Sequence, residues 1–285
     1  ACSPSNKAVA PPGIRVEGCP ARLYLAVFFR SALNLAIRSP IVFSSASIAA
    51  ALAGSAGCGL PPSGGVISGI SSNSSTATQV TIEDVHVSYV RLHGIILGTV
   101  ATAIRGCSAY VCGGNGLTAA AVTDSYADTC GGHGINGTDI ARSSGASTSN
   151  YSGIVASTVT DCRGTGTAGS GIQADLVVGS IGTATGGYGI NTKIARDSRG
   201  TSTNSRGIQA SETAENCTGV STADHGVFAP AAINCQGTST EAMGLFASYC
   251  ATGCLGRSES GNGIATTAAT GCSGTSNSGA GISCY

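Results

Sequence analysis

A Gly-(Ile/Leu/Val) step recurs through most of this chain at a nearly constant interval. The stretch that begins at Gly164 reads GTGTAGSGIQA, and the one that begins at Gly200 reads GTSTNSRGIQA. A period of 18 or 19 residues, kept over many copies, is typical of repeat proteins whose units stack on their neighbours. The glycines of ten consecutive steps are Gly116, Gly134, Gly153, Gly171, Gly189, Gly207, Gly226, Gly244, Gly263 and Gly281.

Within each unit the residue pattern predicts short strands. A unit reads approximately G-I-x-A-x-x-(A/V)-x-(D/N/G)-(C/S)-x-G-T-S-T-x-x-x. Its small and apolar residues alternate, as in strands, and do not follow the spacing of a helix. We expect a coil of three short strands and turns, stacked at about 4.8 Å into a parallel β-solenoid. One column holds residues that tolerate left-handed turns: Asp124, Asp161, Gly179, Asp197, Asn216, Asn234, Gly253 and Gly271.

Two early repeats resemble a known family. Residues 104–117 read IRGCSAYVCGGNGL and residues 122–135 read VTDSYADTCGGHGI. Both are similar to the V-x-x-C-x-A-x-x-N-x-G-x-G-I repeat of right-handed parallel β-helix proteins. The later, Thr-rich coils resemble repeat proteins of environmental bacteria. The resemblance covers about residues 64–285 and implies an all-β, single-stranded right-handed parallel β-helix of about 18-residue coils. A left-handed hexapeptide solenoid is the alternative, and neither specifies an activity.

Residues 1–63 differ from the repeats, and we expect them to form an N-terminal cap region. Residues 21–38 read as a helix with its arginines near one stripe, and Ser39-Pro40 ends it. Such a cap would cover the open end of the first coil. An export or membrane segment is the alternative, because residues 41–57 are uncharged and precede Cys58.

Composition restricts the partners and the compartment. Only 10% of the residues are charged and the formal net charge is zero, which argues against binding nucleic acid. Contact with a membrane is not favoured either. The 13 cysteines suggest an oxidising compartment, so we expect a secreted or cell-surface protein. An odd number leaves at least one thiol unpaired or bonded between chains.

Pairs of threonines separated by one small residue form the most regular candidate surface. We expect both threonines to face outward and the small residue to face inward. The columns resemble the ice-binding face of β-solenoid antifreeze proteins, although exposed strands favour threonine in any case. Arg257 and Glu259 interrupt them. The candidate ice- or surface-binding residues are Thr165, Thr167, Thr183, Thr185, Thr201, Thr203, Thr222, Thr238 and Thr240.

Cysteine and serine share another column, and its cysteines are candidates for disulfides. Stacked coils bring Cα atoms within disulfide range. The alternative is a stack of small buried thiols. A straight column does not surround an ion tetrahedrally, so we expect no zinc site and no cofactor. The disulfide candidates are Cys112 with Cys130 in one column, and Cys217, Cys235, Cys254 and Cys272 in the other.

An enzyme is the third interpretation, after a structural and an ice-binding protein. Many right-handed β-helix proteins cleave polysaccharides with clustered carboxylates. Here Asp124, Asp161 and Asp197 alternate with Arg142 and Gly179, which separates the carboxylates by about 10 Å. We therefore predict no catalytic residue.

The last residues of the sequence suggest how the protein associates. Ile282, Cys284 and Tyr285 begin the first strand of a further coil. An uncovered strand edge is a template for another chain. We expect a structural solenoid that stacks head to tail on other copies through these residues, into filaments. Shielding by Tyr285 and the nearby turns is the alternative, and an ice or carbohydrate surface is the alternative partner.

Overall fold

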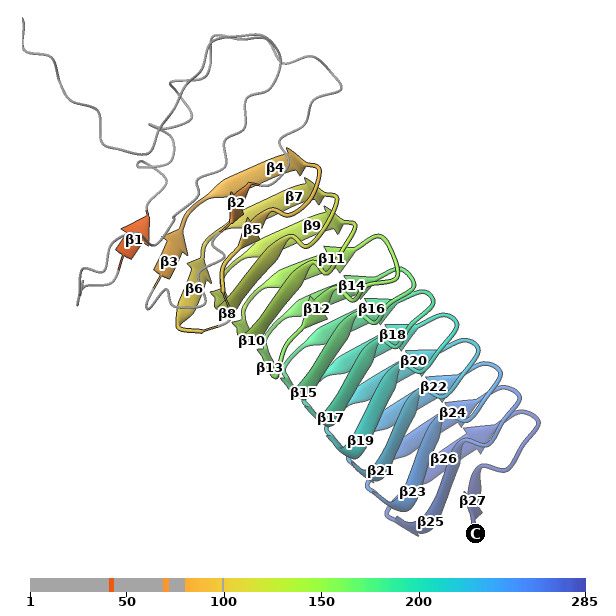
Figure 1. Ribbon diagram of the computed structural model, residues 1–285. Coiled ribbons are helices and arrows are strands. Elements are labelled where there is room, and N and C mark those ends of the chain that lie inside the picture. Colours follow the sequence, from red (N-terminus) through yellow and green to blue (C-terminus); the bar gives the residue numbers. More distant parts are fainter. Residues whose placement is uncertain (1–40, 44–68, 72–79, 99) are drawn as a thin grey trace, which may run out of the picture.

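The computed structural model describes residues 41–43, 69–71, 80–98 and 100–285, and the regular structure of these residues is entirely β (Figure 1). The first sheet contains β1 (Ile41–Phe43), β2 (Ile70–Ser71), β3 (Val80–Glu83), β5 (Ile95–Ile96), β6 (Thr102–Arg105), β8 (Leu117–Thr123), β10 (Ile135–Ala141), β12 (Ile154–Val155), β13 (Thr158–Thr160), β15 (Ile172–Val178), β17 (Ile190–Arg196), β19 (Ile208–Glu215), β21 (Val227–Ile233), β23 (Leu245–Thr252), β25 (Ile264–Thr270) and β27 (Ile282–Cys284).

The second sheet contains one short strand from each coil. Its strands are β4 (His86–Val90), β7 (Ser108–Cys112), β9 (Tyr126–Cys130), β11 (Ser144–Ser147), β14 (Arg163–Gly166), β16 (Ile181–Ala184), β18 (Arg199–Ser202), β20 (Thr218–Ser221), β22 (Gln236–Ser239), β24 (Leu255–Ser258) and β26 (Ser273–Ser276).

Equivalent residues of successive coils lie beside each other, which confirms the predicted parallel β-solenoid. Ile172 pairs with Ile190, and Ile190 pairs with Ile208, with the strands parallel. The two sheets therefore run side by side along one axis, and each coil adds one step to the rod in Figure 1. The strand β10 pairs with β12 through its first residues and with β13 through its last, so the three predicted strands correspond to the two parts of each long strand and the short strand of the second sheet.

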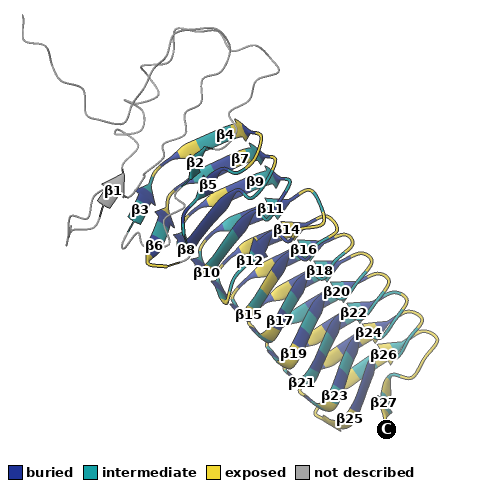
Figure 2. Ribbon diagram, in the orientation of Figure 1, coloured by how far each residue is buried: buried dark blue, intermediate teal, exposed yellow. Residues whose placement is uncertain are grey.

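The core is a column of large aliphatic side chains with small residues around it. Ile172, Ile190, Ile208, Leu245 and Ile264 are each 0% exposed. In Figure 2 the buried residues form a continuous band along the first sheet. A second buried column in the first sheet holds Val122, Val159 and Val177, and later coils have alanine there, as at Ala195 and Ala214.

Two glycine columns explain why GTST and GI recur together. A Cβ atom on Gly182 would lie 2.1 Å from the carbonyl oxygen of Gly189, and 2.6 Å from Cγ1 of Ile190. A Cβ atom on Gly189 would lie 2.4 Å from the amide nitrogen of Thr201, later in the same coil. Because neither glycine has a side chain, the backbone of the GTST segment packs directly against the backbone of the GI segment on the opposite side of the coil.

The predicted left-handed turn column is confirmed. Asp124, Asp161, Asp197 and Asn216 have φ between 50° and 53°. Gly179, Gly253 and Gly271 lie at 61° to 64° in the equivalent turns.

The N-terminal prediction cannot be compared with the fold. The helix expected at residues 21–38 and most of the cap region lie outside the described residues. Among the described residues, no helix is long and apolar enough to cross a membrane.

Candidate functional site

The first threonine column lies on the outer face of the second sheet. Thr165, Thr183 and Thr201 are in register in β14, β16 and β18, while Val220 replaces threonine in β20. Thr165 is exposed, and Thr183, Thr201 and Thr238 are half-buried. The residues between the threonines are buried, as predicted: Gly166, Ala184, Ser202, Ser221 and Ser239.

The second threonine column lies one residue beyond the strands, in the turn. Thr167, Thr185, Thr203 and Thr222 are exposed and Thr240 is half-buried. A third outward column, which the sequence interpretation missed, begins each short strand and carries Arg163, Ile181, Arg199, Thr218, Gln236 and Leu255. The threonine surface is therefore bordered by charged and apolar side chains.

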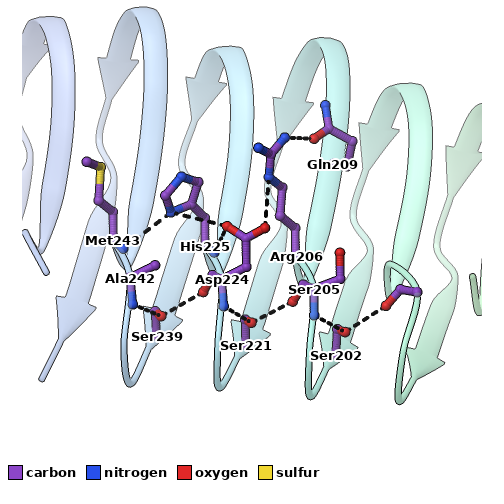
Figure 3. A network of polar contacts seen from close by, with 11 residues as sticks. Ser202, Ser205, Arg206, Gln209, Ser221, Asp224, His225, Ser239, Ala242 and Met243 are labelled. Carbon is purple, nitrogen blue, oxygen red and sulfur yellow. Dashed lines mark hydrogen bonds and ion pairs between the residues drawn. The ribbon is translucent and has the colours of Figure 1, made fainter. Parts of the chain in front are cut away.

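The buried serine between the threonines links each coil to the preceding one. Ser221 Oγ accepts a hydrogen bond from the amide of Asp224 at 3.0 Å and donates one to the carbonyl of Ser205 at 2.6 Å. Ser239 repeats this with the amide of Ala242 at 3.0 Å and the carbonyl of Asp224 at 2.7 Å (Figure 3). Each hydroxyl satisfies two backbone groups of the turns, which makes serine a structural residue at this position.

A polar cluster lies above these serines in the same turns (Figure 3). Arg206 Nε lies 3.4 Å from Asp224 Oδ2. The amide of Met243 donates a hydrogen bond to His225 Nδ1 at 3.3 Å. This nitrogen can accept that hydrogen bond only in the neutral imidazole, in which the 3.7 Å contact with Asp224 Oδ1 is not an ion pair. Burial lowers the pKa of His225, in agreement with that state.

Aromatic rings continue this cluster toward the C-terminal end. Phe228 and Phe246 stack with ring centroids 4.9 Å apart, and His225 lies nearly parallel to both. The guanidinium carbon of Arg206 lies 3.7 Å from the centroid of Phe228, which is a cation–π contact. Tyr285 stacks on Phe246 at 6.3 Å.

The cysteine and serine column is buried and hydrogen-bonded along the axis. Cys107 donates its amide to Ser125 Oγ at 3.2 Å, and Cys162 donates its amide to Ser180 Oγ at 3.0 Å. The amide of Cys235 donates to Cys254 Sγ at 3.4 Å. Thiol and hydroxyl therefore have the same role in successive coils, which explains why both residues occur at this position.

The ten described cysteines are free thiols. Cys112 lies opposite Cys130 in β7 and β9. In-register strands hold Cβ atoms at about the strand spacing of 4.8 Å, which is wider than the 3.5–4.5 Å typical of a disulfide. Pairing of Cys112 with Cys130, or among Cys217, Cys235, Cys254 and Cys272, stays a prediction that requires the coils to move closer.

The aspartates of the turn column border a shallow groove of about 680 Å³. Arg142 donates to both carboxylate oxygens of Asp124, at 2.8 and 2.9 Å, which lowers the pKa of Asp124. Asp161 lies in the same groove, whereas Asp197 accepts a hydrogen bond from the amide group of Asn216 at 3.1 Å. Among the described residues, no three His, Cys, Asp or Glu side chains converge to hold a metal ion.

The last coil exposes Ile282, whose equivalents in the preceding coils of the regular region are buried. Ile282 is 39% exposed and Tyr285 is 64% exposed, and Cys284 is exposed as well. In the described chain, β27 pairs with β25 and β26 pairs with β24, so each presents one unpaired edge.

No protein-family model, curated protein or solved structure matches this chain.

Proposed function

We propose that the protein is a non-catalytic, extracellular structural β-solenoid that associates end to end through the face of its last coil. The right-handed winding implied by the family resemblance is part of this proposal. The observation that carries it is the register of the coils, because each core residue pairs with its equivalent, as Ile264 does with Ile282, and a coil of a second copy could continue this pairing. A second copy that stacked there would bury the side chain of Ile282 and pair the free strand edges.

The long sides of the rod are less suited to tight association. The described ion pairs on them, such as Arg142 with Asp124 and Lys193 with Asp175, join exposed side chains of adjacent coils. Charged side chains on a surface protect it against non-specific contacts. Growth along the axis is therefore favoured over growth sideways.

Electron microscopy of the negatively stained chain tests the proposal. Eleven short strands at about 4.8 Å give a rod of roughly 50 Å. We expect rods of constant width and at least twice that length. A population of single short rods at every concentration would contradict the proposal.

Ice binding is the second candidate, favoured by the register of Thr165, Thr183 and Thr201. Because the strands pair in parallel and in register, the side chains of these threonines lie one strand spacing apart along the sheet. In an ice-recrystallisation assay, Thr183→Lys should reduce activity, whereas Thr252→Lys, which alters an exposed threonine of the first sheet, should not. Equal activity of both variants, or none in the unmodified protein, would exclude this function.

A further inference from the structure

The residues that precede the glycine of each GI step form a column of their own in the turns. Some side chains of this column accept a hydrogen bond from the amide of the equivalent residue in the next coil. Asn262 Oδ1 accepts from the amide of Ala280 at 3.0 Å, and His225 Nδ1 accepts from the amide of Met243 at 3.3 Å. The column therefore links coils through side-chain acceptors, and at His225 the acceptor can be protonated.

The hydrogen bond between His225 and Met243 depends on the charge of the imidazole. Nδ1 accepts only in the neutral ring, where the proton is on Nε2. A proton taken up from water binds to Nδ1 and makes this nitrogen a donor. Asp224 Oδ1 lies 3.7 Å from Nδ1, in the same turn, and can accept from the charged ring (Figure 3). The imidazole thus has one partner in each protonation state, Met243 in the next coil and Asp224 in its own.

The groups packed around His225 have opposite effects on its proton. The side chain is 17% exposed, and this burial lowers its pKa. Asp224 raises the pKa, whereas Arg206 of the preceding coil, whose Nε lies 3.4 Å from Asp224 Oδ2, lowers it. The uncharged rings of Phe228 and Phe246 lie nearly parallel to the imidazole. Because burial has the largest effect, His225 takes up its proton below its ordinary pKa of 6.5.

We propose that His225 is an acid-sensitive link between two coils. The neutral ring holds the turn before β23 through the amide of Met243, and the protonated ring donates to Asp224 and releases that amide. The release is local, because the carbonyl of Met243 still accepts from the amide of Gly226 at 3.2 Å. Acid therefore loosens one turn and leaves the two sheets of the rod paired.

Other residues of the column show what is particular to His225. His133 Nδ1 lies 3.2 Å from the amide nitrogen and 3.3 Å from the carbonyl oxygen of Ser152. A protonated His133 can donate to that carbonyl, so it keeps a bond to the next coil in either state. Tyr151 faces His133 edge-on, with ring centroids 5.0 Å apart. Asn115 Oδ1 accepts from the amide of His133 at 3.0 Å, so an asparagine fits this column and does not titrate.

The test is hydrogen–deuterium exchange at pH 7.5 and pH 4.5, resolved to single amides by fragmentation of the peptides in a mass spectrometer. Rates are expressed as protection factors, which remove the effect of pH on the exchange reaction itself. The protection of the Met243 amide should fall at least about fivefold in acid, as expected for one lost hydrogen bond. The protection of the Gly226 amide should stay the same, because its acceptor does not titrate.

Two variants separate the switch from a general effect of acid. His225→Asn should keep the Met243 amide equally protected at both pH values. Asp224→Asn should move the loss of protection to lower pH, because it removes the carboxylate that raises the pKa of His225. Thermal unfolding at pH 7.5 shows whether each variant is folded.

Equal protection of Met243 at both pH values in the unmodified protein would overturn the proposal. A loss that persists in His225→Asn would overturn it as well, because another group would then be responsible. A loss of the same size at Gly226 would mean that acid opens the whole turn, and not one link. The result does not depend on whether the protein forms filaments.

Discussion

Ile282 lies in register with Ile264, yet Ile282 is 39% exposed whereas Ile264 is completely buried. The two side chains have the same place in successive coils, and the difference arises because no described coil covers Ile282. Burying an isoleucine is worth roughly 1.5–3 kcal/mol in full, so covering the exposed part would contribute about 1 kcal/mol. The free edges of β26 and β27 would add backbone hydrogen bonds.

The close approach of the glycine columns makes a first prediction. Gly182→Ala should lower the free energy of unfolding by at least about 1–3 kcal/mol, because the new methyl group would lie 2.1 Å from the carbonyl oxygen of Gly189. Gly186→Ala is the control, since its nearest neighbour would be Cα of Ala168 at 3.1 Å and the position is exposed. Denaturant unfolding followed by circular dichroism measures both, and similar losses would argue against backbone-to-backbone packing.

The serine ladder makes a second prediction. Ser221→Ala leaves the amide of Asp224 and the carbonyl of Ser205 without the hydroxyl that joins them. Unsatisfied buried polar groups cost about 1–3 kcal/mol, and we expect a loss of stability in that range. Ser211→Ala, at an exposed position of the first sheet, should change stability by less than about 0.5 kcal/mol. If the two variants unfolded at the same denaturant concentration, the hydroxyl would have no structural role.

A third prediction concerns pH. Burial lowers the pKa of His225 in the folded protein below its ordinary value of 6.5. The unfolded chain therefore binds the proton more readily, so stability is constant above about pH 6.5 and decreases as the pH falls below it. Asp224 and Arg206 are the charged groups that face His225, and they act in opposite directions on its pKa.

The histidine variant provides the measurement for this effect. His225→Gln should reduce the decrease of the thermal unfolding midpoint between pH 7.5 and pH 5.5. His133, whose pKa burial also lowers, should account for part of the remaining decrease. An identical pH dependence in the variant and the unmodified protein would show that His225 does not titrate in this range.

The coil spacing and the inward columns could be predicted from the sequence because small residues repeat there in strict register. The Asp, Asn and Gly residues of the turn column predicted its left-handed conformation. Arg142 occupies the same column with φ of 46°, and the sequence did not predict this conformation there. Arginine has no preference for this conformation. Arg142 donates two hydrogen bonds to the carboxylate of Asp124 in the preceding coil, and these bonds hold its side chain in the turn.

Contacts between coils were the part that the sequence did not predict. The middle residue of Thr-Ser-Thr was expected to face inward, but its hydrogen bonds join residues of two different coils. The cluster of Arg206, Asp224, His225 and Phe228 is likewise assembled from three consecutive coils. Phe228 repeats once, as Phe246, but Arg206 and Asp224 do not repeat with the period, so no column identifies the cluster.

Sedimentation velocity over a range of concentrations tests the proposed self-association most directly. The 285-residue chain should show species larger than a monomer that increase with concentration. Ile282→Lys, which places a charge on the face of the last coil, should remain monomeric and folded, and Leu255→Lys, on the side of the rod, should associate like the unmodified protein. A monomer at all concentrations, or association unchanged by Ile282→Lys, would contradict it.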